Sequence, residues 1–324
     1  MLNRRLLLAG SAAALAFPRI SYAANGAIAI RCGALSPGFT SLFFDYIIKK
    51  GIDRKNGVKL ETPIQYTSLY SFHNDFASGT FDLALGSWDT FAVRHAGGVP
   101  IKLLSGLTTA DMIGIMVANE NSKTLQDLTG KVLAGPQGSG VYRMVRAVVK
   151  ETRGFDLENS MTIQNIDAPP TAVSMLLAAR VDAAIAWEPN ISFGTTKQKD
   201  LRVIFNSGEA YREKFGLELP FLGAAIRNDV FAQAPDAGRR INSMLKNCID
   251  DLNANPGLIT SDIAANTNVS MPVIQASIAS NRLRFKFLNA GEGDGRKTFS
   301  AASDFLFQNK AFTKAVAPDF FIDA

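Results

Sequence analysis

Short apolar runs alternate with amphipathic helical patterns along most of the chain, and this alternation predicts an α/β fold. The expected strands cover residues 27–35, 58–66, 81–86, 101–107 and 220–227. The expected helices cover residues 41–50, 69–78, 90–96, 236–253, 258–267, 271–280 and 298–309. Between these groups, residues 127–190 repeat the order of strand, glycine-containing turn, helix and strand, which favours a parallel sheet. Ligands of such sheets bind beyond the carboxyl ends of the strands, so residues at those ends are the candidates.

Two stretches of the chain, residues 77–89 and 177–188, resemble each other. Each has a helix end rich in small residues, an aspartate, a short apolar strand, and a tryptophan followed by an acid. The matching residues are Asp82 and Asp182, Trp88 and Trp187, and Asp89 and Glu188. The similarity predicts two lobes of like build, each directing an aromatic ring and a carboxylate outward from the edge of a sheet.

The first 23 residues have the pattern of an export signal rather than of a folded element. A basic start with Arg4 and Arg5 precedes the apolar run 6–17, and residues 21–23 supply small side chains at the expected cleavage positions. The arginine pair leaves both the general secretory route and the twin-arginine route open. No cysteine follows the cleavage region and no later segment is apolar enough to span a bilayer, so we expect an exported periplasmic protein without a lipid anchor.

Charge and cysteine content narrow the possible partners. The net charge is +5, and removal of the three arginines in residues 1–23 leaves 5 − 3 = +2, too little to indicate nucleic acid or a membrane surface. Cys32 and Cys248 are interpreted as buried, unreactive thiols, although an exported protein could also form a disulfide. No metal-ligand spacing is present. The acidic, glycine-rich residues 291–295 are too few for a calcium loop and predict a solvated turn.

Four segments carry a resemblance to a known family. They are residues 78–84 with the downstream 97–101, residues 125–132, residues 181–189 and the closing residues 317–323. Together with the export signal, they resemble the periplasmic solute-binding proteins of ABC importers in the nitrate/sulfonate/taurine-type group. That group also includes binders of thiamine-pyrimidine precursors. The resemblance extends over nearly all of the chain after residue 23.

The resemblance implies the two-lobed, type II periplasmic-binding-protein fold, with two crossing strands as the hinge. Lobe 1 would comprise residues 26–109 plus 222–324, and lobe 2 residues 110–221. The lobes would close on a small-molecule solute, which contacts both only in the closed state. The protein would then act as a monomer, without cofactor, metal or catalysis, and would associate transiently with the permease of an importer.

Ser139 and Gly140 begin a predicted helix whose backbone N–H groups would form an anion site, although Ser139 is also an ordinary N-cap residue. Neither the P-loop nor the dinucleotide fingerprint is complete here. Trp187 and Trp88 would sandwich a ligand, the alternative being that each is a core residue. Glu188 and Asp89 would accept hydrogen bonds from an amine or hydroxyl, the alternative being acids that stabilise a helix start.

Further candidates follow from their places after strands, at helix starts or at the crossing between the lobes. They are Ser36, Gly38, Phe39, Thr40, Ser68, Tyr70, Ser87, Thr108, Tyr142 and Arg143. Arg143 could pair with an acidic solute, while an exposed helix arginine is the alternative.

An enzyme on a similar fold is the rival class of function. A nucleophile triad would need a histidine, and His73 and His95 are the only two in the sequence. Both fall in predicted helices, and no Gly-x-Ser-x-Gly elbow is present. We therefore expect a binding protein. Its solute would be a small organic molecule such as a sulfonate, an aminosulfonate or an aminopyrimidine.

Overall fold

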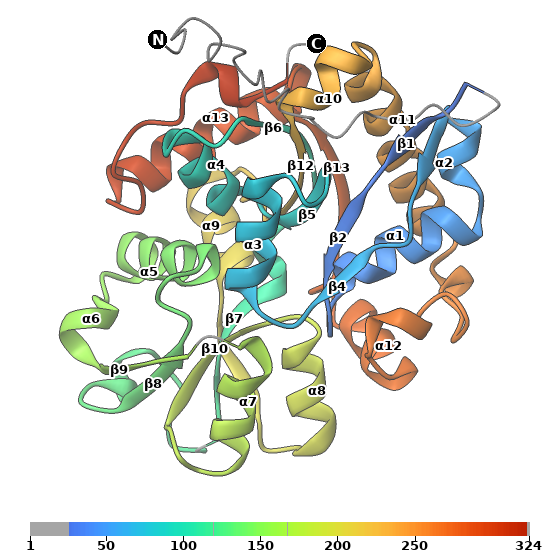
Figure 1. The fold of residues 1–324 in the computed structure, drawn as a ribbon. Helices are drawn as coiled ribbons and strands as arrows, with labels where there is room; N and C mark the ends of the chain where they lie inside the picture. The colour runs from blue at the N-terminus through green and yellow to red at the C-terminus, as the bar shows by residue number, and fades with distance from the viewer. Residues whose placement is uncertain (1–25, 119, 167, 323–324) are drawn as a thin grey trace, which may run out of the picture.

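The computed structural model describes residues 26–118, 120–166 and 168–322. The predicted signal peptide, residues 1–23, lies outside the described residues. The expected α/β class is confirmed, because the strands form two large mixed sheets that are covered by helices. We call these halves the six-stranded lobe and the five-stranded lobe. Figure 1 shows the six-stranded lobe above the five-stranded lobe.

The six-stranded lobe contains a sheet in the order β13-β6-β12-β5-β2-β4. Its strands are β2 (Cys32–Leu35), β4 (Ile64–Tyr66), β5 (Leu83–Ser87), β6 (Ile101–Thr108), β12 (Leu222–Arg227) and β13 (Phe285–Asn289). A separate parallel pair joins β1 (Ile28–Ile30) to β3 (Val58–Leu60). The sequence predicted one strand over 27–35 and one over 58–66. Each is divided in two, the first at Arg31, whose backbone N–H and guanidinium donate to Asp82.

Helices cover both faces of this sheet, with α1 and α11 on one side and α3 and α4 on the other (Figure 1). The helices of this lobe are α1 (Phe39–Lys49), α2 (Ile52–Lys55), α3 (Leu69–Ser78), α4 (Trp88–Ala96), α10 (Asn228–Gln233), α11 (Ala237–Ala254), α12 (Met271–Ala279) and α13 (Gly293–Gln308). The helix predicted over 258–267 is wrong. That segment forms only short 3-10 turns, η3 (Pro256–Leu258) and η4 (Ala265–Thr267).

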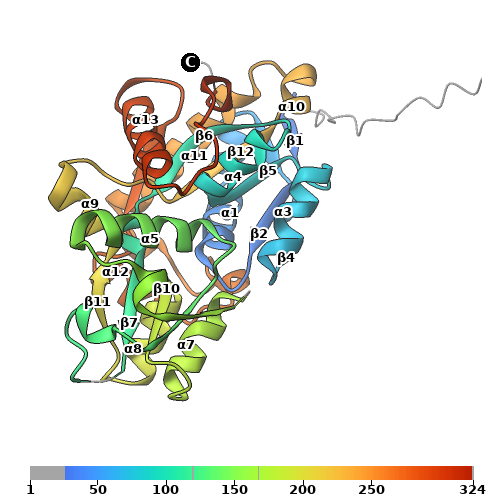
Figure 2. The same ribbon diagram turned by 90° about the vertical axis from the view of Figure 1, so that its left-hand side faces the viewer.

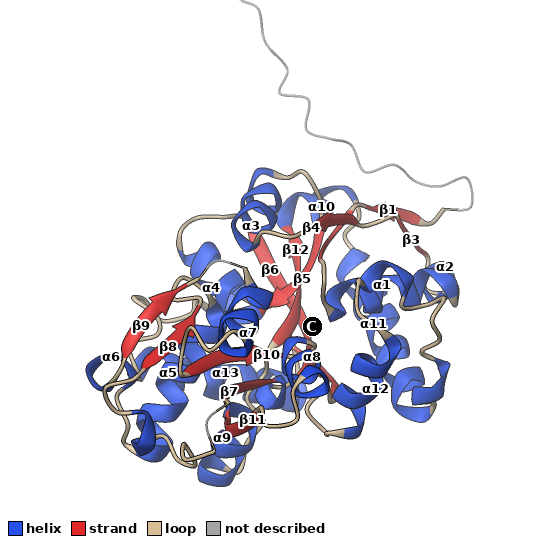
Figure 3. Ribbon diagram, turned by 90° about the horizontal axis from the view of Figure 1, so that it is seen from below, coloured by secondary structure: helices blue, strands red, loops and turns tan. Residues whose placement is uncertain are grey.

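The five-stranded lobe has a sheet in the order β11-β7-β10-β8-β9. Figure 3 shows β9, β8, β10 and β7 side by side in that sequence. The strands are β7 (Ile113–Val117), β8 (Val132–Gly135), β9 (Thr162–Asn165), β10 (Ala183–Trp187) and β11 (Arg202–Asn206). The helices are α5 (Gly140–Arg153), α6 (Leu157–Ser160), α7 (Pro169–Leu177), α8 (Asn190–Lys197) and α9 (Ser207–Phe215), with a 3-10 turn η2 (Gln126–Leu128).

The sheets are mixed rather than parallel, which corrects the sequence-based expectation. The antiparallel strands β7 and β12 each follow a segment that crosses between the lobes, β7 after β6 and β12 after α9. The edge strand β13 of the six-stranded sheet is also antiparallel to its neighbour β6. The two crossing segments run side by side. Thr109 pairs with Pro220, and the N–H groups of Ala110 and Phe221 donate to the carbonyls of Leu219 and Thr108. This pairing forms the expected two-segment hinge, next to the turn η1 (Ala110–Met112).

The division into residues 26–109 plus 222–324 and residues 110–221 stays a prediction. The strands of the two large sheets fall within those ranges. One apolar core extends through both lobes, and a second, smaller core lies between α7 and the five-stranded sheet around Met116, Val173 and Leu176. In the part of the chain that the structure describes, no helix combines the length and apolar character needed to cross a membrane.

The two cysteines behave as the sequence predicted. Cys32 and Cys248 are buried and unpaired, and burial raises the pKa of both thiols above its usual range. The turn predicted over 291–295 is only partly right. Residues 293–295 already belong to α13, which begins five residues earlier than the sequence suggested.

Candidate functional site

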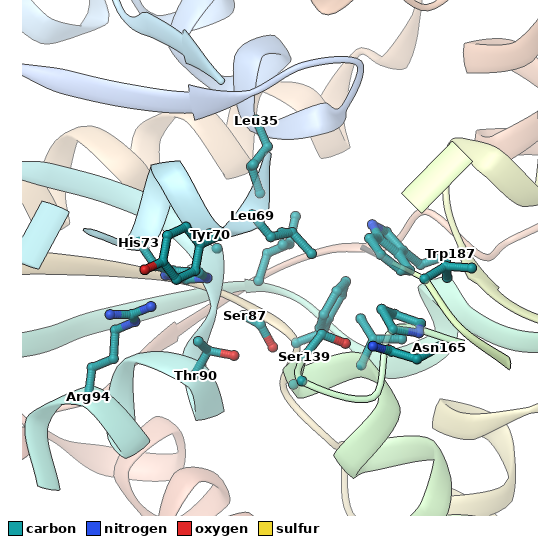
Figure 4. Close-up of a pocket in the computed structure, with 18 residues that line it drawn as sticks. Leu35, Leu69, Tyr70, His73, Ser87, Thr90, Arg94, Ser139, Asn165 and Trp187 are labelled. Carbon is teal, nitrogen blue, oxygen red and sulfur yellow. The ribbon is translucent and has the colours of Figure 1, made fainter. Parts of the chain in front are cut away.

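A cavity of about 260 Å³ lies between the two lobes. It is lined by Leu35, Leu69, Tyr70, His73, Gly86, Ser87, Thr90, Arg94, Phe221 and Leu222 from the six-stranded lobe and by Pro136, Gly138, Ser139, Gly140, Val141, Asn165, Ile166 and Trp187 from the five-stranded lobe. Figure 4 shows Tyr70, His73 and Arg94 at one end and Trp187 and Asn165 at the other. Both lobes therefore contribute to one cavity.

The carboxyl ends of several strands place these residues. Leu35, Ser87, Asn165 and Trp187 each end a strand, β2, β5, β9 and β10 respectively. Ligands of α/β sheets bind at such ends, because the following loops and helix starts converge there. Two helix starts complete the lining, that of α3 with Ser68 as its N-cap and that of α5 with Ser139 as its N-cap.

Ser139 and Gly140 lie at the cavity, and the helix they begin is already opposed by a carboxylate. The Ser139 hydroxyl accepts the N–H of Tyr142 at 3.3 Å, which makes it an ordinary N-cap residue as well as a lining residue. Gly140 is so close to the other lobe that a Cβ there would overlap Asp89 Oδ1 and Ser87 Oγ. The positive end of α5 therefore faces the chain's own acid in this conformation. Figure 2 shows α5 running along the boundary between the lobes.

Asp89 and Arg143 form an ion pair across the lobe boundary instead of facing the cavity. Arg143 Nη2 lies 2.8 Å from Asp89 Oδ2, and the Asp89 side chain is completely buried. Arg143 also donates to the hydroxyl of Thr90 and to the carbonyl of Gly138, and Ser87 donates to Asp89. Neither Asp89 nor Arg143 lines the cavity. Their polar atoms hold the lobes together on this side.

Glu188 has the equivalent position on the other strand end and also pairs across the boundary. It is 1% exposed, and its Oε1 lies 2.6 Å from Arg282 Nε. Arg282 belongs to the part of the chain that follows the second crossing segment. Ser192 donates to it through both its backbone N–H and its hydroxyl, and Ser277 Oγ lies 2.8 Å from Oε2. The carboxylate is thus fully occupied by protein groups.

The two tryptophans are in different surroundings. Trp187 lies at the end of β10, is partly exposed and lines the cavity. Trp88 is 0% exposed and begins α4; its ring packs edge-to-face on Phe299 and Phe312. Its indole N–H donates to the carbonyl of Pro220 at 2.9 Å, as a buried indole requires. The structure brings Trp187, but not Trp88, to the cavity.

Some of the other predicted site residues line the cavity and some do not. Tyr70 and Ser87 line the cavity, whereas Ser36, Gly38, Phe39, Thr40, Ser68, Thr108 and Tyr142 do not. Most of these have local structural contacts. Thr40 Oγ1 donates to the carbonyl of Leu35, which ends β2 beside the cavity. Thr108 Oγ1 accepts the N–H of Leu222, and the Tyr142 hydroxyl donates to Glu158.

Sequence reasoning missed four polar lining residues, His73, Thr90, Arg94 and Asn165. A usable signal was present for two of them. Thr90 and Arg94 lie three and seven positions after Ser87, which places them on one face of the helix that leaves β5. Asn165 ends β9, but this strand is short, mostly polar and weakly patterned.

His73 is a buried, neutral imidazole at the edge of the cavity. Burial, with smaller contributions from the positive charges of Arg94 and Arg143, lowers its pKa to about 3. Its Nδ1 atom has no hydrogen-bond partner within the described residues.

No cluster of metal-ligating side chains occurs among residues 26–118, 120–166 and 168–322. The arrangement offers an aromatic ring, apolar walls and a few polar groups, which suits binding of a small organic molecule.

Solved structures of low sequence identity share this architecture. The alkanesulfonate-binding protein SsuA from Xanthomonas axonopodis pv. citri, bound to MOPS, matches with a TM-score of 0.73 and 16% identity, over 91% of this chain and 98% of that chain. The periplasmic aliphatic sulphonate binding protein SsuA from Escherichia coli matches with a TM-score of 0.72 and 16% identity, over 91% and 92%. The fold is that of the periplasmic binding proteins, as predicted.

The sequence comparison then identifies the family. The family model described as NMT1/THI5 like matches residues 49–257, and the chain belongs to this family. A protein of Brucella abortus (strain 2308), provisionally named as a binding protein, is 26% identical over 262 residues, which are 79% of this chain and 76% of the relative. The membership confirms the group to which the sequence motifs pointed.

Proposed function

We propose that this protein is the periplasmic solute-binding subunit of an ABC importer, a monomer that captures a small organic solute, sulfonate-like, taurine-like or related, and delivers it to the permease. The observation that supports this proposal is the cavity of about 260 Å³ whose walls come from both lobes. A solute held there contacts both lobes at once, so its binding energy favours the closed conformation. The two crossing segments provide the hinge about which the lobes would open.

The lining supports an organic solute rather than a bare inorganic anion. Apolar side chains such as Leu69, Ile166 and Leu222 form much of the wall, and Trp187 offers a flat ring. A second candidate is therefore an aromatic heterocycle, such as a pyrimidine precursor of thiamine. Trp187 favours it, because offset stacking on a planar ligand stabilises a complex beyond the area buried.

A thermal-shift screen of the protein without residues 1–23 tests the proposal. A ligand that binds only the folded protein raises its stability by mass action, by about 2.7 kcal/mol at a hundredfold excess over the Kd. We expect stabilisation by sulfonates, aminosulfonates or aminopyrimidines, weakened in Trp187→Ala and Ser139→Ala. Phe193→Ala, which removes a part-exposed ring outside this cavity, is the control and keeps the response. Unchanged affinity in both cavity variants would refute this location of the site.

A further inference from the structure

Arg94 is the one charged residue in the lining of the cavity, and it has no acidic partner within the described residues. Its only side-chain hydrogen bond there is Nη1 to Asn74 Oδ1, at a long 3.4 Å. The guanidinium is half-buried, and this burial lowers its pKa from the usual value. A partly desolvated cation without a counter-ion costs free energy, so its presence beside a cavity indicates a role in binding.

The other positive groups near the cavity are already neutralised. Arg143 is paired with Asp89, and the same carboxylate lies against the first turn of α5 at Gly140. The helix start that the sequence suggested as the anion site is therefore occupied by an acid of the protein itself. No aspartate or glutamate is found in the described lining. The charges at the site sum to one uncompensated positive charge, that of Arg94.

The surroundings of Arg94 add hydrogen-bonding groups but no charge. His73 is 7% exposed and lies in the cavity wall, with an Nδ1 atom that has no partner in the described part of the chain. Thr90, one turn before Arg94 on α4, and the exposed Tyr70 lie on the same side of the cavity (Figure 4). Trp187 and Asn165 lie at the opposite end, and Leu35 and Leu69 lie between the two ends. The cavity thus has its positive charge at one end and an aromatic ring at the other.

We propose that Arg94 is the specificity-determining residue of this site, and that it selects a singly charged organic anion, a sulfonate or a carboxylate. The acidic group lies at the Arg94 end, and an apolar or aromatic body lies against Trp187. A guanidinium matches both anions, since it donates two parallel hydrogen bonds to their oxygens. This inference rests on the proposed function, and it places the charge recognition on α4 rather than at the start of α5.

Isothermal titration with matched probes tests the assignment. Benzenesulfonate and benzoate carry one negative charge, and benzenesulfonamide and benzamide are their uncharged counterparts of nearly the same shape. We expect the wild-type protein to bind at least one of the anions more tightly than its amide. In Arg94→Gln that anion binds roughly tenfold to a hundredfold more weakly, while the amide is unaffected. Arg239→Gln removes an exposed arginine of α11 and serves as the matched control.

Two further readouts separate recognition from a structural role. The unliganded Arg94→Gln variant is expected to melt at the same temperature as wild type or higher, because an unpaired, half-buried charge is removed. A lower melting temperature, with equal weakening of anion and amide, would assign Arg94 to the structure instead.

Each remaining outcome also decides the question. Equal binding of anion and amide by wild type, both lost in Trp187→Ala, would overturn the role of Arg94 and leave the proposed function intact. Binding that is insensitive to both Arg94→Gln and Trp187→Ala would refute both. No binding of any probe would also overturn the assignment to Arg94, since the aromatic anions carry the two features it requires. Preference between the two anions identifies the acidic group.

Discussion

The segments Trp88-Asp89 and Trp187-Glu188 look alike in the sequence but have different roles in the structure. In both, the acid is buried and pairs with an arginine of the opposite lobe, Asp89 with Arg143 and Glu188 with Arg282. The tryptophans differ. Trp88 is already the first residue of α4 and turns into the core, whereas Trp187 is the last residue of β10 and faces the cavity.

Trp88 lies six positions after Asp82, whereas Trp187 lies five positions after Asp182, and this offset of one position accounts for the difference. β5 leads into α4 without a connecting residue, so Trp88 lies on a helical turn and its side chain points back towards the sheet. After β10, Glu188 and Pro189 separate the strand from α8, so Trp187 keeps the orientation of a strand residue. The acids match in role because each lies at the boundary between the lobes. Similar motifs therefore predict where a residue lies more reliably than what it contacts.

The largest effect that can test this comparison is removal of each indole. Trp88→Ala leaves a cavity among Phe299, Phe312 and neighbouring core residues, and we expect the free energy of unfolding to fall by about 3–5 kcal/mol. Trp187→Ala truncates a partly exposed ring and should cost clearly less while weakening ligand binding. Urea denaturation of both variants measures the difference. Equal losses of stability would contradict the assignment of different roles.

A smaller effect is expected from crowding the Asp89 side of the boundary. In Gly140→Ala the new methyl group overlaps Asp89 Oδ1, so the ion pair with Arg143 must move or the lobes must separate. We expect a loss of about 1–3 kcal/mol in the free energy of unfolding, as for other overpacked sites. Small-angle scattering of the variant should show a larger radius of gyration.

Gly138→Ala is the matched control, because no atom lies within 4 Å of a Cβ placed there. It should leave both stability and radius of gyration close to the wild-type values. If Gly140→Ala behaves in the same way, the close approach of α5 to Asp89 does not exist in solution.

The sequence predicted the class of fold, most of the elements and two of the four strand ends at the cavity, those of β5 and β10. It could do so because apolar periodicity and turn residues are local signals. It did not predict the antiparallel strands β7 and β12, since the direction of a strand depends on where the chain crosses between lobes. Nor could it distinguish an acid that binds solute from one paired across the boundary, because Arg143 and Arg282 are distant in sequence from their partners.

The same reason explains why Arg94 and His73 were missed. Both side chains occur in helices where a solvated or packed residue is the common outcome. Their roles depend on what they lack, an acid near Arg94 and a hydrogen-bond partner for His73 Nδ1 in the described structure. A missing partner leaves no trace in the local sequence. Ser139, by contrast, was identified because its capping role and its place at the cavity follow from the same turn.

The smallest expected effect concerns pH and the Asp89 side of the cavity, where His73 packs against Phe72 and Phe91 near Arg94 and Arg143. Burial holds the folded-state pKa of His73 at about 3, below the unfolded value of 6.5. The unfolded chain therefore takes up a proton below pH 6.5 that the folded protein refuses, and stability falls as the pH decreases. Between pH 6.5 and 5.5 this contribution is about 1 kcal/mol.

His73→Gln should remove that part of the decrease in urea-denaturation experiments, whereas His95→Gln, which replaces the only other histidine, should retain it. An identical pH dependence in wild type and His73→Gln would show that His73 takes up its proton in the folded state. His73 would then add a second positive charge beside Arg94 at that end of the cavity.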